Sequence, residues 1–334
     1  MALVQPPRQG ARSRHTPDGF IIVAVLWILG ALATLASIYA VFIIDTATAF
    51  KARDARVQAE GVIRAALELT AHQVTAQALA TGQPPGAGQP PGGGQPPGGG
   101  QPPDSGQQPP AARPSSGSFT FRLGNASASV QFRSEASRID INMAAPELLA
   151  NMFVSFGARP DDALGYANRI IAWRTKPQAG QDPEASFYQA AGRPYVPRGA
   201  PFPHPAELYL VQGLPPALVD RAMPLVTVYA GRPQVDVIGA PPDVLAALPG
   251  MTPELLGAFL RQRALTPQNG QILLSLLGPA QAHASADATK TLRVTVRISF
   301  DNGRQTSAEV VIFVADGSDP EPYRVLSWHD GLDE

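Results

Sequence analysis

Hydrophobic and polar positions change pattern several times along the chain, and the first pattern is a long uncharged apolar run. From Phe20 to Ile44 this run is interrupted only by Gly30, Thr34 and Ser37. At a rise of 1.5 Å per residue, a helix of this length exceeds a hydrocarbon core of about 30 Å. An ordinary cleaved signal has an apolar region of only about 7 to 15 residues. The run therefore predicts a transmembrane helix over residues 20–44.

The pattern stays helical after the membrane segment. Apolar residues recur at spacings of four and three, as on one face of a helix: Ile63, Leu67, Ala71, Val74 and Ala78. Charges of alternating sign recur at every fourth residue from Arg56 to Glu68, which is typical of a solvated helix face. No proline lies between Asp18 and Gln83. We therefore predict one long helix over residues 20–80.

Residues 81–117 contain a Gln-Pro-Pro motif that repeats every six residues, with glycine between the copies. The segment has no apolar side chain larger than proline and alanine, so it cannot bury a core. The composition predicts a disordered linker or surface loop, partly in polyproline II. Recognition by a proline-binding partner is the alternative interpretation.

Two later regions alternate between apolar and polar residues, which predicts half-buried strands. In residues 118–145 the runs are FTFRL, SASVQF and RIDIN. In residues 289–334 they are TLRVTVRISF, TSAEVVIFV and YRVLSW, and a DNGR turn joins the first two. Neither region has enough strands for a stable sheet. We therefore expect one antiparallel sheet that is interrupted by an insertion and covered on its apolar face by the long N-terminal helix.

The intervening residues, 146–288, have helical spacing and carry an internal repeat. The segment IDINMAAPELLA at Ile139 aligns with VDVIGAPPDVLA at Val235, at a constant offset of 96. Each copy has a proline followed by an acidic residue, as at the first turn of a helix. Duplication of a small unit explains the alignment. The predicted fold is therefore α+β, pilin-like in its long helix and antiparallel sheet, with a large duplicated all-α insertion of helix-hairpin-helix or SAM-like form.

Two segments of the insertion, residues 205–229 and 247–263, have the form of a helix, a short glycine-containing turn and a second helix. Such hairpins can present backbone amides to a phosphate, which raises a DNA-binding hypothesis. Here prolines remove amide donors, and Glu254 repels phosphate. We therefore interpret the hairpins as packing modules or protein contacts, and no nucleic acid is expected.

Composition narrows the classes of function. The 334 residues carry a formal charge of −1, so the chain has no global field for nucleic acid or an anionic membrane. The absence of cysteine excludes disulfides and thiol nucleophiles. The five histidines have no HExxH spacing and no nucleophile-elbow serine nearby. The aromatic residues Trp173, Tyr209 and Phe259 lie at helical spacings in apolar runs and are predicted to be core. We therefore do not expect this protein to be an enzyme.

The chain resembles known protein families in its N-terminal region and in its insertion. Its basic leader, with Arg8, Arg12 and Arg14, is followed by Gly19, an aromatic residue, an apolar helix and a sheet-bearing head, as in type IV pilin-like precursors. The insertion begins after RIDINMAAPELL and carries ANRIIAWR and PFPHPAELYLVQGL. With these motifs it resembles the K-type minor pseudopilin of the type II secretion system, the GspK family.

The resemblance implies how the chain is processed and where it acts. A prepilin peptidase would remove the leader, residues 1–19, by cutting between Gly19 and Phe20, and Phe20 would become N-methylated. Most pilin-like proteins have glutamate at the fifth mature position, but this chain has Ala24. The family shares this lack and is thought to occupy the filament tip with two other minor pseudopilins.

The implied location is the bacterial inner membrane, with a single span, a cytoplasmic N-terminus and a periplasmic head. The implied partners are the other minor pseudopilins, the major pseudopilin and the prepilin peptidase. Two alternatives share parts of the pattern: a membrane-tethered DNA receptor of the competence type, and a minor pilin of a surface type IV pilus.

Family members also resemble one another in binding calcium near an acidic run after the tryptophan-bearing helix. This chain departs there, because Trp173 and Arg174 are followed by Thr175, Lys176 and Pro177. Calcium needs several oxygen ligands. The candidate ligands in this chain are Asp182, Glu184, Asp316, Asp319 and Glu321. Solvated turns are the alternative interpretation of these residues, and no other cofactor is expected.

Overall fold

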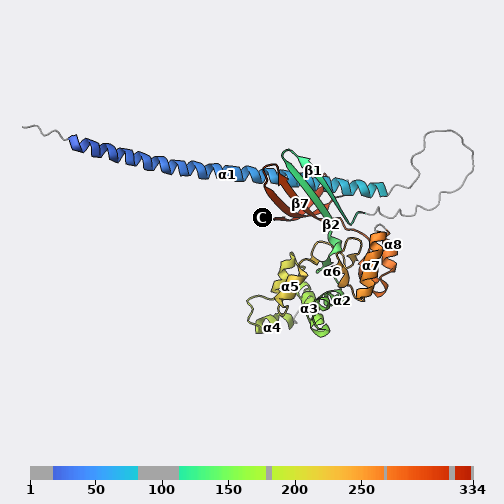
Figure 1. Ribbon diagram of the computed structural model, residues 1–334. Coiled ribbons are helices and arrows are strands. Elements are labelled where there is room, and N and C mark those ends of the chain that lie inside the picture. Colours follow the sequence, from blue (N-terminus) through green and yellow to red (C-terminus); the bar gives the residue numbers. More distant parts are fainter. Residues whose placement is uncertain (1–17, 82–112, 178–182, 267–268, 316–319, 332–334) are drawn as a thin grey trace, which may run out of the picture. The chain divides into compact units, whose positions relative to one another are not determined.

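Figure 1 shows the computed structural model, which describes residues 18–81, 113–177, 183–266, 269–315 and 320–331. Most of the predicted Gln/Pro/Gly tract lies outside these residues. The chain divides into two compact units between Glu60 and Gly61. The boundary falls inside helix α1, so we describe the two parts of that helix separately.

Helix α1, Asp18–Thr81, is a single helix of 64 residues, as predicted. In the first unit the side chains from Ile22 to Ile43 are exposed, apart from a half-buried Ala24. In the second unit the helix buries a stripe at spacings of three and four: Val62, Ile63, Ala66, Leu67, Thr70, Ala71 and Val74. This stripe is the amphipathic face that a helix needs to pack on a sheet.

The second unit is built on a five-stranded antiparallel sheet with the order β1-β2-β7-β8-β9. The strands are β1 Ser116–Leu123, β2 Ala126–Ser134, β7 Thr291–Phe300, β8 Gln305–Val314 and β9 Tyr323–Asp330. Five of the predicted runs are therefore confirmed as strands of one sheet, and β1 begins at Ser116, three residues before the FTFRL run. The strand regions before and after the insertion build a common sheet, as the interrupted pattern indicated.

The sheet has one apolar face and one polar face. On β7 the side chains of Leu292, Val294, Val296, Ile298 and Phe300 are all buried. They align with buried residues of β2 and β8 on the same face. The part of α1 after Gly61 runs along the sheet (Figure 1), and its buried stripe supplies the cover that this face needs. The opposite face carries Arg293, Thr295 and their neighbours.

The insertion, residues 135–290, lies between the adjacent strands β2 and β7. Its helical elements are η1 Glu135–Ser137, α2 Pro146–Ser155, α3 Pro160–Arg174, α4 Pro183–Ala190, η2 Pro205–Leu210, α5 Pro216–Ala222, α6 Pro242–Ala246, α7 Pro253–Leu265, α8 Gly270–Ser275 and η3 Gly278–His283. The helices pack around one hydrophobic core, which is separate from the contact between α1 and the sheet.

One of the predicted strands belongs to a different sheet from the one expected. The RIDIN run does not join the five-stranded sheet. It forms β3, Ile139–Asp140, which pairs in parallel with β4, Val226–Thr227, inside the insertion. Ile139 and Ile141 are fully buried in the core of the insertion rather than half-buried on a sheet face. A short segment that buries every second residue has the same sequence pattern in both places.

The sequence duplication corresponds to a repeated structure. The second copy forms β5, Val235–Asp236, which pairs in parallel with β6, Ala284–Ser285. The last residue of each strand is an aspartate whose side chain accepts the backbone N–H two residues later, at 2.8 Å from Asn142 to Asp140 and 3.1 Å from Ile238 to Asp236. This turn directs the chain into α2 in one copy and α6 in the other.

In each copy of the repeat an arginine side chain binds the turn that follows the short strand. Arg174, at the end of α3, donates to the carbonyl oxygens of Ile141 and Ala144. Arg263, near the end of α7, donates to the equivalent carbonyls of Val237 and Ala240, at 3.0 and 2.6 Å. Because these carbonyls belong to the turn before the first helix, each arginine ties the second helix of its copy to the turn.

Three helical hairpins share the sequence pattern Gly-x-x-Pro. The glycines are Gly157, Gly213 and Gly250, with φ values of 92°, 86° and 83°. A glycine tolerates this left-handed conformation, and the proline three residues later starts the next helix. The hairpin at Gly250 joins α6 to α7 as predicted, whereas the first arm of the hairpin at Gly213 is the 3-10 helix η2. The hairpin at Gly157 was not predicted.

Two of the three aromatic predictions are confirmed. Trp173 and Phe259 are buried in the insertion core. Tyr209 is 48% exposed, so the prediction that it is core is wrong. It lies on η2, and its hydroxyl donates to the carboxylate of Asp220 at the surface. Because tyrosine has a polar hydroxyl on an apolar ring, it occurs both in the core and at the surface. Helical spacing alone therefore does not predict whether it is buried.

The packing of α1 on the sheet can be tested with two leucines of the same helix. Leu67 is fully buried, and Leu69 is 45% exposed. We expect Leu67→Ala to lower the free energy of unfolding of the full chain by about 2 to 5 kcal/mol, because it removes buried apolar area and leaves a cavity. Leu69→Ala should change it by less than about 1 kcal/mol. Urea denaturation in detergent measures both, and equal losses would contradict the packing.

Candidate functional site

The structure places the predicted processing residues in helix α1. Gly19 and Phe20 belong to its first turn, but their side chains lie outside the described residues. Ala24 lies in the same helix, within the segment Ile22–Ile43, which is long and apolar enough to cross a membrane. This segment has a mean hydropathy of 2.2, and none of it is buried inside the structure. A long apolar helix without cover needs lipid or another protein around it.

The calcium candidates are not brought together where the structure describes them. Asp182, Asp316 and Asp319 lie outside the described residues, and Glu321 is exposed. Glu184 lies in the first turn of α4, and its Oε2 atom is buried without a hydrogen-bond partner among the described residues. Within the described ranges no group of three His, Asp or Glu side chains is placed to hold a metal ion. The calcium hypothesis therefore stays a prediction.

Two histidines that are distant in sequence meet beside the sheet. The rings of His204 and His329 lie 6.0 Å apart between centroids. Nδ1 of His204 accepts the backbone N–H of Ala206 and caps η2. His329 contacts Ser327 on its own strand. These contacts are typical of structural histidines.

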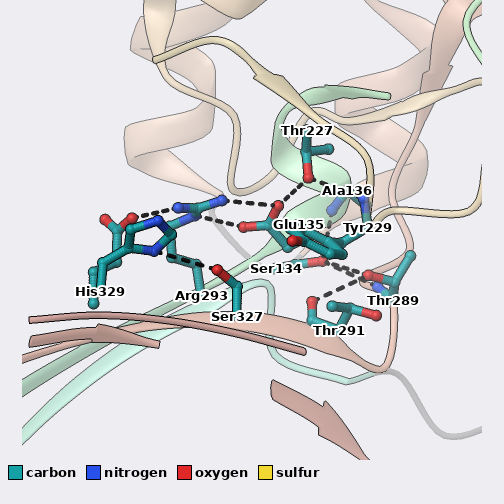
Figure 2. A network of polar contacts seen from close by, with 11 residues as sticks. Ser134, Glu135, Ala136, Thr227, Tyr229, Thr289, Thr291, Arg293, Ser327 and His329 are labelled. Atoms are coloured by element: carbon teal, nitrogen blue, oxygen red, sulfur yellow. Dashed lines mark hydrogen bonds and ion pairs between the residues drawn. The ribbon is translucent and has the colours of Figure 1, made fainter. Parts of the chain in front are cut away.

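A network of buried polar groups joins the insertion to the polar face of the sheet, and Figure 2 shows it. At the point where the chain leaves β2, Oγ of Ser134 accepts the backbone N–H groups of Ala136 and Thr289, at 3.3 and 3.0 Å. Thr289 lies just before β7. The two chain segments that connect the insertion to the sheet are therefore fastened to each other.

Glu135 is the centre of this network (Figure 2). Its side chain is only 1% exposed. Oε1 accepts a hydrogen bond of 2.7 Å from Nε of Arg293 on β7, and Oε2 accepts from Nη2 of Arg293 at 3.3 Å and from the hydroxyl of Thr227 on β4. One carboxylate therefore links η1, a strand of the insertion and a central strand of the sheet.

Arg293 has a second carboxylate partner. Its Nη1 atom donates to Glu309 on β8, the next strand of the sheet. Burial disfavours the charge of Arg293, but attraction by Glu135 and Glu309 outweighs burial and raises the pKa of the guanidinium. Since arginine stays protonated in any case, the physical consequence is a permanently charged bridge between two carboxylates.

An open cleft of about 440 Å³ lies beside this network. Its walls come from β1, β2, β7 and β8 on the polar face of the sheet and from η1 with the residues after it. Arg133, Arg138, Arg293, Glu135 and Glu309 are its charged residues. The strand pattern indicated a polar face, but it did not indicate that the insertion folds over it and leaves a charged cleft.

The joint between insertion and sheet can be tested against a surface ion pair of the same chemistry. We expect Glu135→Gln to lower the free energy of unfolding by about 3 kcal/mol, because it removes one partner of a buried, hydrogen-bonded pair. Arg122→Gln breaks the pair of Arg122 and Asp301, whose side chains are 60% and 55% exposed, and should have an effect below about 1 kcal/mol. Thermal and urea unfolding measure both variants. Similar stabilities would show that Glu135 does not hold the joint.

Comparison with known proteins bears directly on this arrangement. Residues 125–231 match a protein family described as type II secretion system (T2SS), protein K. The matched segment contains β2, Glu135 and the first copy of the repeat as far as Gly231. No curated protein sequence matches the chain at the significance required.

The fold is similar to that of a chain in the crystal structure of the GspK-GspI-GspJ complex from the type 2 secretion system of enterotoxigenic Escherichia coli. The two chains share 16% sequence identity with a TM-score of 0.52, and the match covers 83% of this chain and 99% of that chain. At this identity the comparison concerns the fold. The family match over residues 125–231 and the shared fold thus make the chain similar to K-type minor pseudopilins of type II secretion systems.

Proposed function

We propose that the chain caps or initiates the tip of a periplasmic pseudopilus, as a structural subunit without catalysis. The observation that carries this proposal is the insertion of residues 135–290, which the buried Glu135–Arg293 pair holds on the polar face of the sheet. In a helical filament every subunit has neighbours above and below. A large, firmly attached insertion is hard to place between such neighbours, but the end of a filament has room for it.

Ala24 supports the same position. A glutamate inside the membrane is favourable only when a partner, such as the free amine of a neighbouring subunit, compensates its charge. Ala24 has no charge to offer to the amine of a subunit above it. The chain therefore lacks the contact that would recruit the next subunit on that side, as expected of a subunit at the end.

The proposed partners are two other minor pseudopilins. The similar Escherichia coli chain was crystallised in a complex with GspI and GspJ, and this supports the proposal of equivalent partners for this chain. The major pseudopilin and the prepilin peptidase complete the proposed set. The uncovered apolar helix fits a single-pass anchor in the inner membrane, and the arginines of the leader favour a cytoplasmic N-terminus.

The hairpins of the insertion do not favour the competing DNA-binding function. Helix α7 begins with Pro253 and Glu254 after its N-cap Thr252. The backbone N–H of Glu254 and the hydroxyl of Thr252 both interact with the Glu254 carboxylate and lower its pKa. Helix α3 likewise begins with Pro160, Asp161 and Asp162. Carboxylates occupy the helix ends at which a phosphate would bind.

Processing can be tested by N-terminal sequencing of the membrane-extracted protein after coexpression with a prepilin peptidase. We expect the chain to begin at an N-methylated Phe20. Gly19→Leu should block the cut, because a bulky side chain would stand beside the proposed scissile bond, whereas Gly30→Leu in the same helix should leave it unchanged. A chain that begins at Met1, or one that begins after Ala40, would contradict the proposal.

The tip position can be tested by immunogold labelling of sheared pseudopili. We expect label against the insertion at one end of each filament, because tip capping needs only the terminal site. Label against the major pseudopilin should follow the whole length and serves as the control. In detergent, the processed chain should copurify with the two other minor pseudopilins of its own system. Label along the whole filament would refute tip capping.

A further inference from the structure

The cleft beside the insertion contains an arginine that forms no hydrogen bond or ion pair with any described side chain. Arg138 follows η1 and lines the cleft with Arg133, Arg293, Glu135 and Glu309. Arg293 uses its donors on both glutamates. Within the part of the chain that the structure describes, the Arg138 side chain makes no hydrogen bond and no ion pair. The cleft thus has three guanidinium groups for two carboxylates.

The surroundings of Arg138 make its charge costly. Burial lowers the pKa of the guanidinium, repulsion by Arg293 lowers it further, and Glu135 and Glu309 compensate only in part. Arginine does not lose its proton under these conditions. A partly desolvated cation with unused N–H donors is unfavourable until an anion pairs with it. Arg138 lines an open cleft of about 440 Å³, which leaves room for such an anion.

We propose that this cleft is a carboxylate-binding site in which Arg138 is the principal ligand. A guanidinium group binds a carboxylate through two parallel hydrogen bonds. The single excess positive charge of the cleft matches the single negative charge of a carboxylate better than the charge of a phosphate dianion. The hydroxyl groups of Ser116, Ser118 and Thr295 also line the cleft and supply neutral donors.

The carboxylate that binds in the cleft could come from two sources. The cleft reaches β1, which is an edge strand of the sheet, so an acidic side chain of a neighbouring chain has access to it. A free small carboxylate is the other source. Binding of a carboxylate does not depend on the tip position proposed above, and only the assignment to a neighbouring pseudopilin rests on it.

The probe is sodium acetate, with sodium chloride at the same ionic strength as the reference. Thermal unfolding of the full chain in detergent should shift upward by about 2 to 4 °C at about 100 mM acetate. Arg138→Gln should lose this shift. Its unfolding temperature in chloride should equal or exceed that of the wild type, because the variant removes a half-buried positive charge that Arg293 repels. Arg297→Gln, an exposed arginine of β7 outside the cleft, should keep the shift.

An equal acetate shift in Arg138→Gln, or no acetate-specific shift in the wild type, would overturn the proposal. The source is then decided by copurification with the other minor pseudopilins. If Arg138→Gln and acetate each release a partner that the wild-type chain retains, the carboxylate belongs to that partner. If the acetate shift is lost in the variant while copurification is unchanged, the site takes a free carboxylate. Failure of the wild type to copurify would count against the proposed function and leave the acetate result standing.

Discussion

The buried pair of Glu135 and Arg293 is the interaction on which the arrangement of the second unit depends. Removing two charges from water is unfavourable unless their geometry and further hydrogen bonds compensate. Here Thr227 and Glu309 supply those bonds, from the insertion and from the sheet. The pair therefore forms well only when η1, β4, β7 and β8 are all in place. Its contribution is to specify one position of the insertion, because apolar contact alone is not directional.

The elements with a long and regular pattern were predictable from the sequence. Strand β7 alternates over ten residues, and α1 continues its apolar stripe for several turns. The RIDIN run was misplaced because two residues of alternation do not distinguish a sheet face from a helical core. The hairpin at Gly157 was missed although its Gly-x-x-Pro pattern also occurs at Gly213 and Gly250.

The network around Glu135 and the cleft beside it could not be predicted from any local pattern in the sequence. Glu135 and Arg293 are separated by 158 positions, and nothing near either residue indicates that they pair. Both lie in or next to segments with strand-like alternation, where a charged residue is expected to face water. Tertiary structure buries them because the insertion folds back over the polar face. The three guanidinium groups of the cleft likewise gather from β2, β7 and the segment after η1.

The position of the insertion also constrains the order in which the head folds. The β1–β2 and β7–β8 hairpins are local, but a two-stranded hairpin is only marginally stable on its own. Pairing of β2 with β7 must bring Ser134 to Leu292 across the whole insertion. A compact insertion brings these ends together, whereas an unfolded one opposes their pairing through loop-closure entropy. An insertion that fails to fold would thus leave two separate hairpins with exposed inner edges, so completion of the sheet reports that the insertion is already formed.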